Sequence, residues 1–142
     1  WGELDYLIID LPPGTGDAHL TLAQSSKLSG SIIISTPQDV ALIDARKGIN
    51  MFKKVNVPVL GIVENMSYFI CSKCHERHEI FSYGGAKEEA EKFETPFLGE
   101  LPLDKNLRIY SDEGRPICVS DPESSIAATY LSIAKKVHSD LH

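Results

Sequence analysis

Two groups of residues in this chain have types and spacings that can do chemistry. The first is Asp10, which follows an apolar stretch and precedes the turn-forming segment Leu11–Gly16. An acidic side chain at that place can hold Mg²⁺ or a water bound to it, and Gly14 leaves its backbone N–H open to a terminal phosphate. An Asp that merely caps a turn at a strand end explains the spacing equally well. The second group is the Cys71-x-x-Cys74 pair, whose thiols are ligands for a metal ion or cluster.

The cysteine pair supplies only part of a metal site. Its position in a loop, away from a strand-to-helix junction, argues against a thioredoxin-like redox motif. Two thiolates cannot complete a metal or cluster site, which requires about four ligands. Either other ligands complete the site or a second subunit contributes its own pair. His75 and His78 raise a zinc alternative, but Cys-x-x-Cys-His-x-x-His is too compact to enclose one ion as a zinc finger does. Cys118 is isolated and is predicted to be a buried apolar residue.

Composition excludes several classes of protein. The 142 residues are enough for one domain with a real core, and 42% hydrophobic with 24% charged residues is typical of a globular protein. The net charge of −6 argues against nucleic acid or an anionic membrane as the main partner. No apolar run approaches the ~20 residues of a membrane span. Three cysteines are too few for a disulfide scaffold, so we expect a reducing compartment: the cytoplasm, or alternatively an organelle matrix such as the mitochondrion.

Alternating strands and helices are expected to position these residues. Apolar patterning predicts strands at 4–10, 31–35, 57–63 and 96–100, and helices at 17–28, 39–55, 86–93, 104–112 and 122–138. Asp17 and Asp39 are expected to cap the first two helices. The helical basic residues are assigned to solvation: Arg46, Lys47, Lys87 and Lys92. The alternation predicts an α/β fold with a mostly parallel, doubly wound sheet that carries helices on both faces.

Several residues of interest follow directly on predicted strands. In parallel sheets, ligands bind at the carboxyl ends of the strands. Asp10, Pro37, Asn65 and Pro102 are all placed there by the predicted strands. We therefore expect these four residues along one edge of the sheet.

Six segments, in order along the chain, resemble the Mrp/ApbC-type family of iron–sulfur cluster carriers. These segments are Asp5–Asp17, Ser35–Ala41, Val63–Ser67, Cys71–Cys74, Gly99–Asp104 and Gly114–Ile117. The family belongs to the P-loop ATPases that include MinD and the nitrogenase iron protein. The resemblance covers nearly the whole chain and implies a MinD-like, partial P-loop NTPase fold. Ser72 departs from the family pattern, which often has proline there, with little consequence for metal ligation.

The resemblance implies roles for individual residues in ATP binding and hydrolysis. Asp10 resembles the switch II aspartate that acts on Mg²⁺, and Gly14 the glycine that senses the γ-phosphate; these are the expected catalytic residues. Asn65 matches the asparagine that hydrogen-bonds the adenine, although a turn asparagine would look the same. The expected nucleotide-binding residues are Pro12, Pro13, Asn65, Leu101, Pro102 and Asp104.

In this family the cysteine motif is understood to bridge two subunits. The resemblance therefore implies that Cys71 and Cys74 hold a [4Fe–4S] cluster in a homodimer, which then delivers it to recipient apo iron–sulfur proteins. Zinc at the cysteine pair is the alternative. A MinD-like regulatory switch with a structural zinc is the corresponding alternative function.

The chain has no Gly-x-x-x-x-Gly-Lys-[Ser/Thr] motif and no Lys-Gly-Gly-Val-Gly-Lys variant of it. The family has this phosphate-binding loop upstream of the segment where the chain begins. We therefore expect residues 1–142 to be a single domain, the C-terminal part of a P-loop NTPase domain, with residues 66–82 as a cysteine-containing insertion. The parent is expected to be an ATPase and the chain alone to be inactive. Its unpaired strands are expected to close the sheet differently or to associate.

Overall fold

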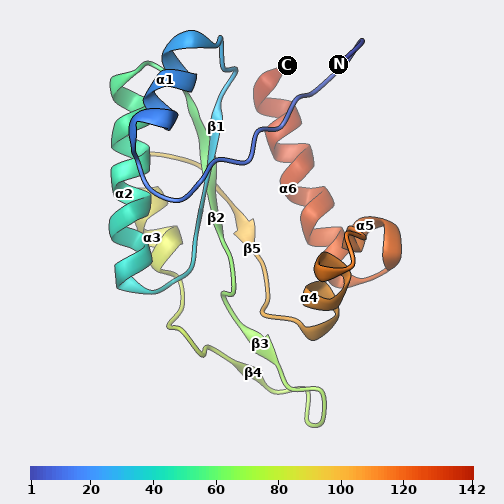
Figure 1. Cartoon of the computed structure of the whole chain (residues 1–142). Helices are drawn as coiled ribbons and strands as arrows, with labels where there is room; N and C mark the ends of the chain where they lie inside the picture. The colour runs from blue at the N-terminus through green and yellow to red at the C-terminus, as the bar shows by residue number, and fades with distance from the viewer.

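The computed structural model describes residues 1–142 and contains a three-stranded parallel sheet with the strand order β1-β2-β5 (Figure 1). A separate antiparallel pair, β3 and β4, forms a hairpin below this sheet in Figure 1. The elements in chain order are α1 (Asp17–Ser25), β1 (Ser31–Ser35), α2 (Asp39–Lys54), β2 (Val59–Glu64), β3 (Phe69–Ile70), β4 (Arg77–His78), α3 (Gly85–Lys92), β5 (Phe97–Glu100), α4 (Lys105–Asp112), α5 (Ile117–Ser120) and α6 (Ser125–Leu141).

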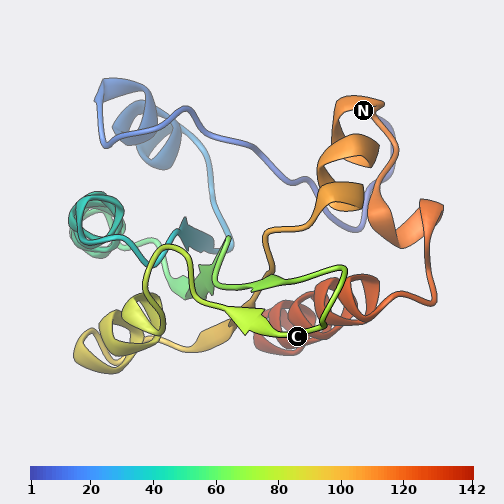
Figure 2. The ribbon, with the colours of Figure 1, turned by 90° about the horizontal axis from the view of Figure 1, so that it is seen from below.

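Helices cover both faces of the parallel sheet, as predicted (Figures 1 and 2). α2 and α3 pack on one face, where Ile62 joins a core that includes Ile49, and α6 packs on the other, where Val63 joins Leu98 and Leu101. Successive residues of a strand point to opposite faces, so the central strand β2 serves both cores. None of the helices combines the length and apolar composition that a bilayer crossing requires.

The predicted strand at residues 4–10 is wrong. These residues form an exposed, unpaired segment, with Ile8 89% exposed. The segment runs past the β1 edge toward α1 (Figures 1 and 2), and the Tyr6 hydroxyl contacts Nδ1 of His138 on α6. A strand requires a neighbouring backbone to satisfy its N–H and C=O groups, and no strand of this chain pairs with the segment. Its β-rich composition therefore does not produce a strand here.

The five predicted helices are present with shifted ends, and some details differ. α1 and α2 begin after Gly16 and Gln38, and neither has a side-chain cap, so the prediction that Asp17 and Asp39 act as caps is wrong. Both acids lie instead in the first turn of their helix, where the helix dipole stabilises a negative charge. The short helix α5 and the β3–β4 hairpin, within a stretch predicted to be irregular, were not predicted. Their lengths, four residues and two residues per strand, are too short for a periodic signal.

The assignment of Arg46 and Lys92 to solvation is also wrong. Glu89 on α3 is buried, and its carboxylate accepts hydrogen bonds from Arg46 Nε at 2.8 Å and Nη2 at 3.0 Å, and from Lys92 Nζ at 3.0 Å. The two bonds from Arg46 fasten α2 to α3, whereas the bond from Lys92 lies within α3. The hydrogen bonds from the Arg46 guanidinium hold the pKa of Glu89 below its ordinary value of 4.5, and the hydrogen bond from Lys92 has a smaller effect in the same direction.

The lowered pKa of Glu89 predicts a pH dependence of stability. Its contribution is complete above pH 4.5, the ordinary value, and is lost as pH falls through the lower pKa of the folded state. In denaturant titrations followed by circular dichroism, we expect the unfolding free energy of the unmodified chain to fall more steeply below pH 4.5 than that of Glu89→Gln. Glu91→Gln, at an exposed position of the same helix, is the matched control and should keep the steep fall. Equal slopes for the unmodified chain and Glu89→Gln would contradict the assignment.

Candidate functional site

Three segments meet at the carboxyl ends of the parallel strands, and we call this edge the rim: residues 35–37, 64–67 and 100–104. The N–H of Asn65 donates to the carbonyl of Ser35 at 2.7 Å, and the N–H of Leu101 donates to the carbonyl of Glu64 at 2.8 Å. These bonds continue the ladder beyond the strands and hold the segments in register. The structure thus brings three of the four predicted strand-end residues to one edge: Pro37, Asn65 and Pro102.

Glu64 is a fully buried acid at the centre of the rim. Its Oε2 accepts from the N–H of Ala86 at 2.8 Å, and its Oε1 accepts from the N–H of Gly84 at 3.2 Å and from the hydroxyl of Ser67 at 2.6 Å. Gly84 and Ala86 lie at the start of α3, where free N–H groups and the helix dipole favour a negatively charged acceptor. Sequence reasoning missed Glu64, because nothing in the sequence shows that the start of α3 meets the end of β2.

Asn65 is half-buried on the rim, and the two ends of its side-chain amide have different surroundings. Its Oδ1 accepts from the N–H of Met66 at 2.9 Å, and Met66 has a left-handed φ of 54°. Asn65 therefore shapes its own turn. Its side-chain NH₂ group, in contrast, donates to no group of the chain and offers two donors to a ligand.

The segment 101–104 forms the neighbouring wall of the rim. Leu101 and Pro102 are buried, and the Asp104 carboxylate accepts from the N–H of Leu107 at 2.8 Å as the cap of α4. A cavity of about 200 Å³ opens beside this segment, between the hairpin and the start of α6. Its lining residues are Tyr68, Ile70, Pro102, Leu103, Asp104, Ser125 and Ile126.

The structure does not bring the segment that contains Asp10 to the rim. Asp10, Pro12, Pro13 and Gly14 are exposed and make no hydrogen bond to the rest of the chain. The expected convergence of Asp10 with the other strand ends is therefore wrong, because the strand that would position it does not form. Gly14 has a φ of 100°, in the region that only glycine adopts readily.

The two cysteines lie in the turn that joins β3 to β4. The N–H of Cys71 donates to the carbonyl of Glu76, and the N–H of His75 donates to the carbonyl of Cys71, both at 2.9 Å. Cys74 is exposed and Cys71 half-buried. The backbone N–H groups of Cys74 and Lys73 and the side chain of Cys74 lower the pKa of Cys71. A lowered pKa increases the thiolate fraction, which is the form that binds metal.

Cys118 differs from the pair in position and surroundings. It lies on α5, half-buried rather than buried as predicted, with its sulfur 4.0 Å from the carbonyl of Ala127 on α6. The pair of nearby thiols is thus confined to the hairpin.

Arg77 of β4 fastens the hairpin to the rim. Its Nη1 and Nη2 donate to Glu100 at 3.2 and 3.4 Å. The guanidinium lies 3.9 Å from the ring centre of Tyr68 and 4.9 Å from that of Tyr83, close enough for cation–π attraction. Glu100 Oε2 in turn lies 3.2 Å from the hydroxyl of Ser67. The hairpin and the rim therefore share one contiguous set of polar contacts.

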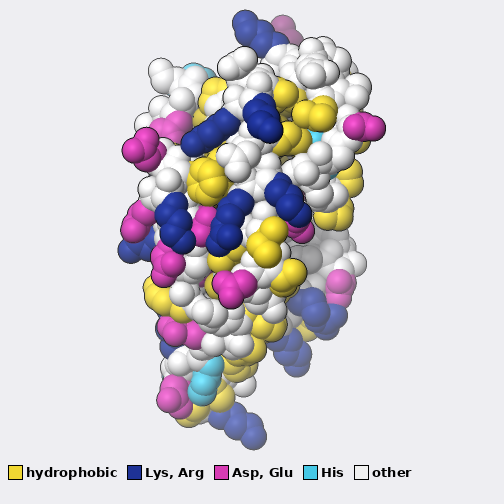
Figure 3. Space-filling view, turned by 90° about the vertical axis from the view of Figure 1, so that its left-hand side faces the viewer, with side chains coloured by type: hydrophobic (Ala, Val, Ile, Leu, Met, Phe, Trp, Pro, Cys, Tyr) yellow, Lys and Arg dark blue, Asp and Glu magenta, His cyan; other side chains and the backbone are white.

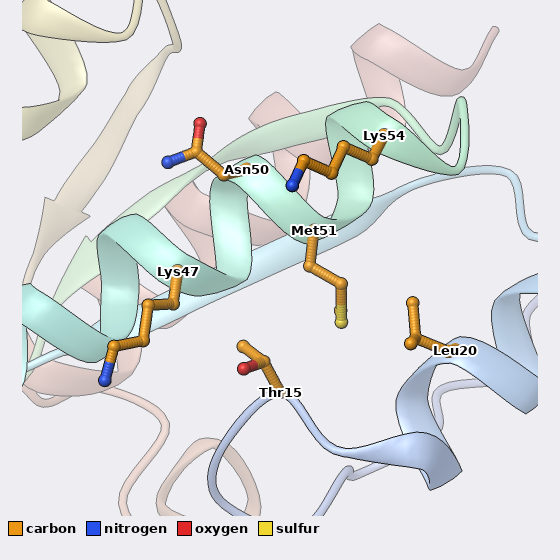
Figure 4. Close-up of a pocket in the computed structure, with 6 residues that line it drawn as sticks. All are labelled: Thr15, Leu20, Lys47, Asn50, Met51 and Lys54. Carbon is orange, nitrogen blue, oxygen red and sulfur yellow. The ribbon is translucent and has the colours of Figure 1, made fainter.

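A larger cavity of about 350 Å³ lies away from the rim, between α1 and α2 (Figure 4). Its lining residues are Thr15, Leu20, Lys47, Asn50, Met51 and Lys54. Basic side chains gather on this side of the molecule (Figure 3). None of the predicted nucleotide or metal residues lines this cavity, whereas Pro102 and Asp104 line the smaller one. We therefore take the smaller cavity as the candidate site.

Comparisons with known proteins identify relatives across almost the whole chain. The family model described as NUBPL iron-transfer P-loop NTPase, of the ParA family, matches residues 1–138. The chain is 54% identical over 142 residues to the iron-sulfur cluster carrier protein of Escherichia coli strain K12, covering 100% of this chain and 38% of that protein. It is 52% identical over 137 residues to the Arabidopsis thaliana protein named "Iron-sulfur protein required for NADH dehydrogenase, mitochondrial", covering 96% of this chain and 44% of that one. The chain thus spans less than half the length of these curated relatives.

Solved structures agree with this family match. A nucleotide-binding protein of Archaeoglobus fulgidus, in complex with ADP and with cobalt found in it, superposes with a TM-score of 0.74 and 49% identity, covering 87% of this chain and 50% of that one. The cell division ATPase MinD of Pyrococcus furiosus gives a TM-score of 0.62 at 23% identity, covering 78% of this chain and 43% of that one, and this likeness shows the fold alone.

The MinD-like α/β fold and the resemblance to iron–sulfur cluster carriers are both confirmed. The chain belongs to the NUBPL-type iron-transfer P-loop NTPases of the ParA family.

Proposed function

We propose that the full-length protein is an ATP-binding iron–sulfur cluster carrier. In this proposal it holds a [4Fe–4S] cluster between two copies of the chain and delivers it to apo iron–sulfur proteins. The observation that carries the proposal is the pair of thiols in a hairpin whose β4 strand is fastened to the rim by Arg77 and Glu100. The names of the relatives, which are iron–sulfur carrier and iron–sulfur proteins, support it.

The donor set of the hairpin fits a cluster as cargo. Cys74 is exposed, and the lowered pKa of Cys71 favours its thiolate. One chain offers two nearby thiols, whereas a cluster with four irons requires about four ligands. A second copy of the chain, approaching through the exposed turn, would supply the other two. This stoichiometry is the reason for proposing a homodimer.

The rim fits the adenine side of a nucleotide site. In the proposal the free NH₂ group of Asn65 donates to the base, and Leu101, Pro102 and Asp104 lie against it. The ADP in the archaeal relative supports a nucleotide in proteins of this kind. Bound Mg²⁺ would supply charge neutralisation at the phosphates, and Asp10 would hold it or its water, beside Pro12, Pro13 and Gly14.

The phosphate side of the site is proposed to come from outside residues 1–142. We propose that these residues are the C-terminal part of one P-loop NTPase domain, with 66–82 as its cysteine-containing insertion. A strand that leads into the phosphate-binding loop would then pair with residues 4–10 and carry Asp10 to the rim. Without that loop we expect no ATPase activity from the chain alone.

Arg77 provides a physical route between the two proposed sites. A nucleotide that moves the segment 101–104 would also move Glu100, and with it the hairpin. Carriage in the cytoplasm or the mitochondrial matrix agrees with bacterial and mitochondrial relatives. The alternative function is a MinD-like regulatory switch with a structural zinc at the cysteine pair.

Anaerobic reconstitution of the full-length protein with iron and sulfide tests the cargo. We expect the visible absorption of a [4Fe–4S] cluster in the wild type, and its loss in Cys71→Ala and Cys74→Ala, because each variant removes two of the four proposed ligands, one from each copy. Cys118→Ala is the matched control and should retain the cluster. Equal loss from all three variants would defeat the assignment, and a protein that takes up only zinc would favour the regulatory switch.

The donor function of Asn65 can be separated from its turn function. Asn65→Asp keeps the acceptor for the Met66 N–H but removes the NH₂ group, so ATP binding should weaken by about 1–3 kcal/mol, or roughly 5- to 150-fold. GTP should compete poorly at the wild-type site. Calorimetric titration of the full-length protein measures both effects, and Asn106→Asp, exposed on α4, is the control. Unchanged affinity in Asn65→Asp would show that Asn65 serves only its turn.

The Asp10 carboxylate is expected to act in hydrolysis rather than in binding the base. Asp10→Asn in the full-length protein should leave ATP affinity largely intact and lower phosphate release by about tenfold or more. Asp5→Asn, an exposed acid of the same segment, is the control. Hydrolysis at the wild-type rate in Asp10→Asn would rule out the role.

A further inference from the structure

We infer that one face of the cysteine hairpin is a binding site for a single divalent transition-metal ion of the zinc type, held by Cys74, Glu76 and His78 of one chain. The sulfur of Cys74, a carboxylate oxygen of Glu76 and an imidazole nitrogen of His78 all lie within 4.8 Å of one another. This set shares only Cys74 with the cysteine pair and lies within a single chain. The inferred ion site therefore does not depend on whether the protein carries a cluster.

The backbone of the hairpin explains why these three side chains converge. Side chains alternate along extended backbone, so Glu76, which directly precedes β4, and His78 share the face opposite to Arg77. The Oε2 of Glu76 lies 3.9 Å from the Nε2 of His78. His75 has a left-handed φ of 59°, which turns the chain just before β4 and returns the Cys74 side chain to the same face.

The donors are suited to zinc and its neighbours in the first transition row. Thiolate and imidazole ligands favour Zn²⁺ or Co²⁺ over Mg²⁺ or Ca²⁺, which prefer all-oxygen sites. Three protein ligands with an open fourth position is the arrangement of zinc sites that also bind a small exogenous ligand. Ligand atoms around a tetrahedral ion lie about 3.5 Å apart. All three side chains are exposed, so rotamer changes can close the remaining distance without repacking a core.

Contacts other than those among the three donors hold the hairpin in this shape. Arg77 is fixed by Glu100 and by the rings of Tyr68 and Tyr83. The His78 ring lies 6.5 Å from that of Phe69, its partner in the β3–β4 pair. The frame of the site is therefore formed before an ion binds, which reduces the entropy that binding costs.

The shared cysteine has a direct consequence. An ion on Cys74, Glu76 and His78 occupies a thiolate that a cluster between Cys71 and Cys74 also requires. The ion and the cluster therefore exclude each other in the same chain. Zinc bound in this way would keep the hairpin closed to a cluster without needing a second copy of the protein.

Cobalt titration of the reduced, metal-free, full-length protein tests the inference. We expect the intense visible bands of tetrahedral Co²⁺ together with a thiolate charge-transfer band, saturating at about one ion per chain at any protein concentration. Loss of a side chain that only orients a metal ligand costs roughly 10- to 100-fold in metal affinity, so the loss of a ligand itself should cost at least about tenfold. His78→Asn and Glu76→Gln should each weaken binding by that amount, and Cys74→Ser should remove the charge-transfer band.

Two matched variants complete the experiment. His75→Asn removes the neighbouring imidazole, keeps a residue that tolerates a left-handed φ, and should leave cobalt affinity unchanged. Cys71→Ser should also retain cobalt binding, while cluster reconstitution fails. Saturation at about half an ion per chain with a requirement for Cys71 would assign the ion to a bridging cysteine site and overturn the inference. Unchanged affinity in both His78→Asn and Glu76→Gln would overturn it as well.

Discussion

The oxygens of a carboxylate without exposed surface must be hydrogen-bonded, because burial of an unpartnered charge costs several kcal/mol or more. At Glu64 the partners are the hydroxyl of Ser67 and the first N–H groups of α3, and this requirement fixes where α3 begins. The two glycines before Ala86 make the arrangement sterically possible. Gly84 has a left-handed φ of 78°, and a Cβ on Gly85 would lie 2.6 Å from Leu42 Cδ1 and 3.0 Å from the carbonyl of Pro37. One buried acid therefore ties the end of β2 to α3, and the glycines let α3 approach the end of β1.

The hydroxyl of Ser67 extends this constraint toward the hairpin. It has a single proton and lies nearer to Glu64, at 2.6 Å, than to Glu100, at 3.2 Å, so it donates to Glu64. Glu100 consequently depends on Arg77 for its charge-assisted partners, and Arg77 in turn can reach Glu100 only while the hairpin lies against the rim. The docked hairpin is thus a consequence of how two acids on neighbouring strands divide the available donors. A ligand that competes for Glu100, or displaces it, would loosen the docked hairpin.

Sequence reasoning succeeded where the signal was local and failed where it depended on a distant neighbour. The signal was local in β1, β2 and β5, which are short apolar runs, and in α6, which has apolar residues at helical spacing. The parallel α/β sheet could therefore be predicted. Residues 4–10 have the same β-rich composition as β1. A strand, however, also requires a second segment to pair with, and no strand of this chain pairs with residues 4–10. Asn65 and Pro102 could be placed because strand ends follow from strand assignments. Glu64, Arg77 and Glu76 were missed, because each acquires its function from a segment that only the folded hairpin or α3 brings to it.

The alternation of side chains along residues 76–78, which include β4, gives the hairpin two chemically different faces. Arg77 points to the rim and holds the hairpin in place, while Glu76 and His78 lie with Cys74 on the other face. The proposed ion would take its three protein ligands from one chain, whereas the proposed cluster, which requires about four ligands, would take them from two chains. If both proposals hold, the association state of the protein selects between the two occupants. Dilution would then favour the ion, because its site is complete in a monomer, and pairing of two chains would favour the cluster, because only the pair doubles the number of thiolates. The position of Cys74 in both proposed ligand sets would make the two occupants mutually exclusive.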